Sequence, residues 1–147
     1  MSSKTGTNRI QEMVDTLQEW QGIERKSMSD TAEIMEKTTN PLIRILMEII
    51  RHDSLMHHRV QQFLIDSVTV ADVTVTREDV AEIWEMIEAH DATERKTIEI
   101  AKQLKEKAWT PVHKQLLDYL ITDETKHDHL LVQLGEIKSA MTKRSGG

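Results

Sequence analysis

Acidic and imidazole side chains interrupt the apolar stripes of this sequence at helical spacing. Leu17, Glu24 and Met28 share one helix face, so Glu24 falls where a core residue is expected. The ionisable groups that interrupt the stripes in this way are Glu24, Asp53, His57, Glu94, Glu124 and His127, and Asp123 directly precedes one of them. Carboxylates and imidazoles that converge between helices suit iron, manganese or zinc, whereas oxygen ligands alone would favour calcium or magnesium.

The cost of burying these groups favours a bound cation. An unpaired buried carboxylate costs several kcal/mol, and neighbouring carboxylates repel one another unless protons or a cation compensate. The acidic groups Glu24, Asp53, Glu94 and Glu124 lie about 13–15 residues from the nearest predicted turn, so antiparallel helices would bring them within roughly one helical turn of a common height. We therefore expect a metal site halfway along the helices.

Four long helices are needed to position these groups. Apolar residues at steps of three and four predict helices over 8–37, 41–66, 77–107 and 111–141. The breaks are marked by Asn40-Pro41 and Thr110-Pro111, each a capping residue before a proline, and by a capping-box pattern over 76–79. The β-branched linker 67–76 is expected to be extended, and Met1–Thr7 and Thr142–Gly147 are expected to be frayed tails.

The two halves of the chain resemble each other at one constant offset. Three patterns recur 70 residues later without a gap: Glu24-Arg25-Lys26-Ser27 as Glu94-Arg95-Lys96-Thr97, Asn40-Pro41 as Thr110-Pro111, and Asp53-x-x-x-His57 as Asp123-x-x-x-His127. Such repeats usually mean that one supersecondary unit is used twice. We therefore predict an all-α fold, a four-helix bundle made of two antiparallel hairpins, 8–66 and 77–141, in a single domain spanning 1–147.

This pattern resembles the ferritin-like di-iron proteins, which include ferritins, bacterioferritins and rubrerythrins. Those proteins take one glutamate from each of two helices and a Glu-x-x-His pair from each of the other two. Glu24 and Glu94 match the single glutamates, and Glu124 with His127 matches one of the pairs. The resemblance implies a site for one or two iron ions, with manganese or zinc as substitutes, that oxidises ferrous iron or reduces peroxide.

One position departs from the family pattern. Ser54 stands where the glutamate of the second pair belongs, although Asp53 and His57 are kept. Asp53 is one position earlier and points about 100° away from that glutamate's direction, so it could replace the missing ligand only in part. One metal ion, or a second ion held weakly, is therefore the expectation.

The linker favours a simple up-down-up-down order of helices. A ferritin-type crossover along the bundle would span about 46 Å, whereas ten residues of extended chain reach at most about 36 Å. Hemerythrins share the simpler architecture, but their sites are rich in histidine, and the first predicted helix contains none.

Net charge and cysteine content exclude or disfavour several classes of partner and metal site. The net charge of −6 disfavours nucleic acid or an anionic membrane as a partner, and the absence of cysteine excludes thiolate metal sites and disulfides. With no signal-peptide or membrane-span pattern, we expect a cytoplasmic protein, and we expect a homo-oligomer. The remaining histidines, His52, His58, His90, His113 and His129, are expected to be solvated or to support a ligand. The alternative function is a metal-free bundle that serves as an interaction or dimerisation module and retains a degenerate site.

Overall fold

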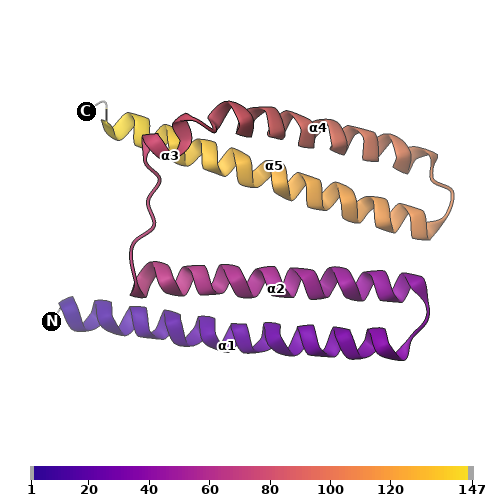
Figure 1. The fold of residues 1–147 in the computed structure, drawn as a ribbon, viewed down its shortest axis with the longest axis horizontal. Helices are drawn as coiled ribbons and strands as arrows, with labels where there is room; N and C mark the ends of the chain where they lie inside the picture. The colour runs from indigo at the N-terminus through magenta and orange to yellow at the C-terminus, as the bar shows by residue number, and fades with distance from the viewer. Residues whose placement is uncertain (1, 146–147) are drawn as a thin grey trace. The chain divides into compact units, whose positions relative to one another are not determined.

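All of the regular secondary structure in the described part of the chain is helical. The computed structural model describes residues 2–145, with the side chains of residues 6–140, and no strand occurs among them. The helices are α1 (Ser2–Lys37), α2 (Pro41–Thr69), α3 (Arg77–Ala81), α4 (Trp84–Lys107) and α5 (Pro111–Ser145), as Figure 1 shows. The predicted all-α class is confirmed. No helix in this part of the chain combines the length and apolar character needed to cross a membrane.

Capping residues set the turn of each hairpin where the sequence predicts it. The Asn40 side chain accepts hydrogen bonds from the backbone N–H groups of Leu42 and Ile43, at 3.0 and 3.2 Å, and Pro41 is the first residue of α2. At the second turn the backbone N–H of His113 donates to Thr110 Oγ1 at 3.1 Å. These bonds satisfy N–H groups that lack a partner within the first helical turn.

The predicted continuous helix over 77–107 is wrong in one respect, because it is divided into α3 and α4. The predicted capping box is present: Thr76 accepts from the Asp79 N–H while Asp79 accepts from the Thr76 N–H. After α3, the Ile83 N–H bonds to Val80 O at 3.3 Å, a tighter turn than an α-helix makes. Neither glycine nor proline marks the break at residues 82–83, and nothing in the structure explains it.

The helix ends also differ from the prediction. α1 begins at Ser2 and α5 continues to Ser145, so the predicted frayed tails are helical over residues 2–7 and 142–145, while residues 1 and 146–147 lie outside the described range. α2 extends to Thr69, into the predicted linker. There Ser67 Oγ donates to Leu64 O and Thr69 Oγ1 donates to Ile65 O, bonds that let hydroxyl residues remain in a helix. The linker between α2 and α3 is residues 70–76.

The helices form two compact units that divide between Val73 and Thr74. The first hairpin consists of α1 and α2 packed against each other, and the second of α3, α4 and α5. Val14, Leu17 and Ile65 form the buried apolar cluster of the first hairpin. The packing of both hairpins into one four-helix bundle stays a prediction.

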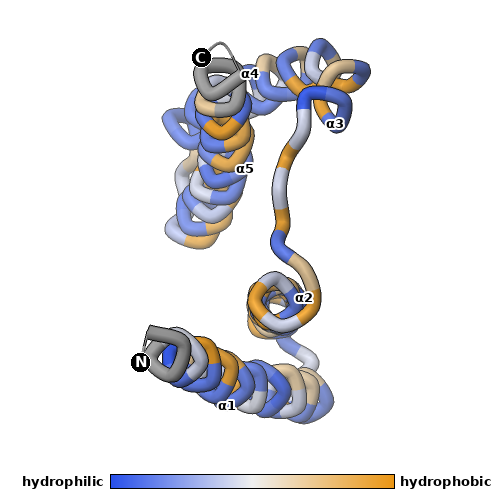
Figure 2. Tube along the Cα trace, turned by 90° about the vertical axis from the view of Figure 1, so that its left-hand side faces the viewer, coloured by the Kyte–Doolittle hydropathy of each residue, from blue (hydrophilic) through white to orange (hydrophobic). Residues whose placement is uncertain are grey.

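Each hairpin buries only one side of its helices. Figure 2 shows apolar and polar residues distributed around the helices, and large apolar side chains such as Phe63 on α2 and Leu130 on α5 are each 56% exposed. Several buried positions are polar instead, including Gln21, Gln61 and Thr31. The packed interior of each hairpin is therefore thin, and it holds side chains that need hydrogen-bond partners or a cation.

Candidate metal centre

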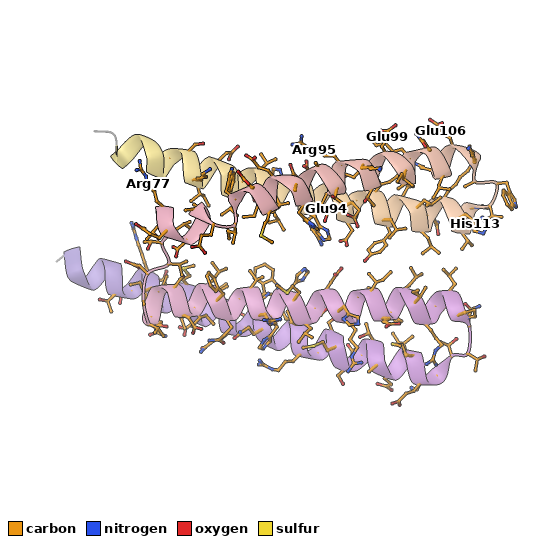
Figure 3. The ribbon with its side chains drawn as sticks, turned by 45° about the horizontal axis from the view of Figure 1, so that its top comes forward. Arg77, Glu94, Arg95, Glu99, Glu106 and His113 are labelled. Carbon is orange, nitrogen blue, oxygen red and sulfur yellow. The ribbon has the colours of Figure 1, made fainter. Side chains whose placement is uncertain are left out.

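Three potential metal ligands meet in the second hairpin. Glu94 projects from α4, and Glu124 and His127 project from α5 one helical turn apart; each offers one ligand atom, and these atoms all lie within 4.8 Å of one another. His127 Nδ1 is 3.6 Å from Glu94 Oε1 and 3.9 Å from Glu124 Oε2. Figure 3 labels Glu94 near the middle of α4. The antiparallel packing of α4 and α5 produces the cluster, as the spacing from the turn predicts.

Glu94 carries the largest burial cost of this group. The residue is only 8% exposed, and its Oε2 atom is buried with no hydrogen-bond partner among the described residues. A buried acceptor left without a partner costs about 1–3 kcal/mol, and more when the group is charged. A cation at this position would supply the missing partner.

The histidine orientation suits a metal ligand. His127 Nδ1 faces the two glutamates, whereas Nε2 lies 3.7 Å from Asp123 Oδ2. Metal-bound histidines usually direct the other ring nitrogen toward a carboxylate, which fixes the tautomer. Asp123 is also held by Lys126 at 2.8 Å, so it lies behind the histidine rather than among the three converging groups.

The spacing of the donors fits a small divalent ion. Metal–nitrogen and metal–oxygen bonds of about 2.0–2.2 Å place two tetrahedral ligands about 3.4 Å apart. The two separations from His127, 3.6 and 3.9 Å, exceed that value by a few tenths of an ångström, and all three donor atoms lie within 4.8 Å of one another. One imidazole and two carboxylates form the mixed donor set that manganese, iron and zinc accept.

A fourth group contacts the cluster from α4. His90 Nε2 lies 2.8 Å from Glu94 Oε1, one helical turn before it, with the His90 side chain 63% exposed. The sequence predicts that His90 is solvated or supports a ligand, but it does not connect His90 to Glu94. The available signal was the spacing of four residues, which places two side chains on the same helix face.

Beside the cluster, Arg95 joins two aspartates on facing helices. Its guanidinium lies 3.0 Å from Asp91 Oδ2 and 3.2 Å from Asp128 Oδ1. A hydrogen bond shared with Asp128 raises the pKa of Asp91, and burial raises it further while Arg95 opposes both. The same bond to Asp91, together with the bond from Arg95, lowers the pKa of Asp128. These contacts connect α4 to α5 next to the candidate ligands.

The first hairpin has an incomplete version of the cluster. Glu24 is buried, at 7% exposure, and its Oε1 lies 3.4 Å from His57 Nδ1. Ser54 is also buried, and its hydroxyl donates to Ser27 Oγ at 2.9 Å across the hairpin. Asp53 is half-buried and joins no metal-ligand group. Within the described residues of this hairpin, no three acidic or imidazole side chains converge.

Contacts at repeat-related positions are alike in the two hairpins. Glu24 approaches His57 as Glu94 approaches His127. Arg25 Nη1 lies 3.2 Å from His58 Nε2, and the repeat-related Arg95 contacts Asp128 at the same distance. The clearest difference lies at the pair position, where one hairpin has Ser54 and the other Glu124.

The seven predicted ligands thus divide between the hairpins. Glu94, Glu124 and His127 converge with Asp123 beside them, while Glu24 and His57 form a separate pair and Asp53 stands apart from it.

Comparisons of the chain with protein-family models, curated proteins and solved structures found no match. The case for a function therefore rests on the geometry of the chain itself.

Proposed function

We propose that this protein binds a transition metal ion in its second hairpin, through Glu94, Glu124 and His127. The observation that carries the proposal is the buried Glu94 carboxylate, whose Oε2 lacks a partner while its other oxygen faces an imidazole. A purely structural role would favour an ion pair with arginine or lysine, yet neighbouring Arg95 bonds to Asp91 and Asp128 instead. A cation shared with Glu124 and His127 would offset the burial cost.

Iron is the metal we propose, with manganese or zinc able to substitute. Three protein ligands would leave coordination positions open. Oxidation of ferrous iron or reduction of peroxide is the reaction class that the ferritin-like resemblance implies for such an iron ion. The protein side chains would bind the ion, fix the His127 tautomer through Asp123, and limit the access of water. In the fuller ferritin-like form of the proposal, the hairpins pack as a four-helix bundle, and Glu24 and His57 join the site.

Metal content tests the proposal directly. Purified protein is incubated anaerobically with ferrous iron, desalted, and analysed for iron per chain. We expect about one tightly held iron in the wild type and a loss of most of it in His127→Ala. Wild-type protein that retains no iron, or a variant that retains as much as the wild type, would overturn the proposal.

The repeat supplies a matched variant for the same experiment. His57→Ala removes the corresponding imidazole from the first hairpin, where no third donor converges. Unchanged iron content in this variant would restrict the site to the second hairpin. Reduced iron content would favour the fuller form in which both hairpins contribute ligands.

A second candidate function is a metal-free interaction module. The hydrogen bond between Ser54 and Ser27 favours it, because this buried position is satisfied without a cation. Exposed apolar residues such as Phe63 and Leu130 would then contact a partner. Sedimentation of metal-free protein at several concentrations tests this candidate: self-association that chelator leaves unchanged would support it, and a monomer at every concentration would argue against dimerisation.

A further inference from the structure

We infer that His90 is a positioning residue of this metal site, acting on Glu94 rather than on the metal. The inference rests on the proposed function and names a residue outside the predicted ligand set. Its basis is the 2.8 Å contact between His90 Nε2 and Glu94 Oε1. This contact is much shorter than the 3.6 Å between the same oxygen and His127 Nδ1.

The difference in burial between His90 and Glu94 indicates that His90 orients the Glu94 carboxylate. The His90 side chain is 63% exposed and the Glu94 side chain 10% exposed, so a histidine at the surface reaches a carboxylate in the interior. With its Nε2–H donating to Oε1, His90 restrains rotation of the carboxylate and leaves Oε2 as the oxygen without a partner. Hydrogen bonds of this kind orient ligating carboxylates in metal sites.

Two observations separate positioning from ligation. The group of ligand atoms lying within 4.8 Å of one another comprises Glu94, Glu124 and His127, and His90 is not part of it. His90 also projects from the same helix as Glu94, at the spacing that favours a side-chain pair along one helix face. The repeat agrees with a specialised role, because Trp20 occupies the related position in the first hairpin, where the cluster is incomplete.

The test uses cobalt(II) as the probe, since its visible absorption reports the ligands directly. The affinity for cobalt is measured by competition with a chelator in wild type, His90→Ala and His90→Gln. Glutamine places an amide N–H close to the position of imidazole Nε2, so it can keep the hydrogen bond to Glu94. His113→Gln is the control, about 20 Å along α5 from His127.

We expect His90→Ala to weaken cobalt binding about 10- to 100-fold, with the stoichiometry and the absorption bands unchanged. His90→Gln should recover most of the affinity, and His113→Gln should match the wild type. If His90→Ala binds within twofold of the wild type, the inference fails while the proposed function stands. If both variants are equally weak and their cobalt spectra change, His90 is a ligand and the positioning role is wrong. If the wild type takes up no cobalt, the proposed function fails and the inference fails with it.

Discussion

Replacing Glu94 with methionine should reverse the order of stability between metal-free and metal-loaded protein. Glu94→Met keeps a side chain of similar length while removing the buried oxygen that lacks a partner. That oxygen costs about 1–3 kcal/mol. The hydrogen bond to His90 is lost too, but His90 is 63% exposed, so water can replace it. In chelator we therefore expect the variant to be more stable by about 1–3 kcal/mol.

Added metal should act on the wild type alone. At a free metal concentration of about one thousand times Kd, binding stabilises the folded state by about 4.1 kcal/mol, which exceeds the advantage of the variant. Each kcal/mol corresponds to about 4–8 °C in a domain of 60–100 residues. The wild type should therefore melt below Glu94→Met in chelator and above it in manganese or cobalt, as followed by circular dichroism at 222 nm.

Gln61→Leu provides the control for this experiment. Gln61 is 3% exposed, and its Oε1 atom is also buried without a hydrogen-bond partner, but it lies in the first hairpin. Leucine is the residue at the repeat-related position 131. This variant should gain stability in chelator and keep the full response to metal. Two results would refute the reasoning: a wild-type melting temperature that metal leaves unchanged, or a Glu94→Met variant less stable than the wild type in chelator.

Three further results follow from contacts in the two units. Ser54→Glu should raise the metal bound per chain by about one equivalent, because it adds a carboxylate beside Glu24 and His57; unchanged metal content would show that the first hairpin cannot form a site. Thr76→Ala should destabilise the protein by about 1 kcal/mol in urea titrations through loss of the α3 cap, and an unchanged midpoint would contradict this. Hydrogen bonds from Thr76 lower the pKa of Asp79, so the Asp79 contribution is complete above its unfolded pKa and is lost as pH falls through the folded value. Asp79→Asn should therefore be less stable than the wild type at pH 7 and equal to it at strongly acidic pH.

Local signals account for the parts of the fold that could be predicted. Asn40 and Thr110, each before a proline, mark turns because their side chains satisfy backbone N–H groups at a fixed distance along the chain. The break before Trp84 has no comparable local cause, so periodicity alone predicted one continuous helix. The end of α2 differs from the prediction because β-branched residues favour strands only weakly. The hydroxyl groups of Ser67 and Thr69 donate to Leu64 O and Ile65 O within the helix instead.

Helical spacing predicts which side chains of the candidate site lie at the same height along the helices. Glu94, Glu124 and His127 converge because their distances from one turn are nearly equal, a quantity that residue numbers supply. Two features of the two hairpins depend on side-chain conformation, which the spacing of residues does not predict. The hydroxyl pair that satisfies Ser54 and the ring orientation that brings His90 onto Glu94 are both set by rotamers.

The hydrogen bond between Ser54 and Ser27 has a consequence for how the chain responds to metal supply. Since this bond satisfies the buried position without a cation, local opening of the first hairpin should proceed equally fast at any metal concentration. Opening of the second hairpin exposes the Glu94 carboxylate to water, so metal bound there would slow it. Amide hydrogen exchange would then slow with added metal in α4 and α5 but stay constant in α1 and α2, so that a single chain contains a metal-responsive half and its own internal reference.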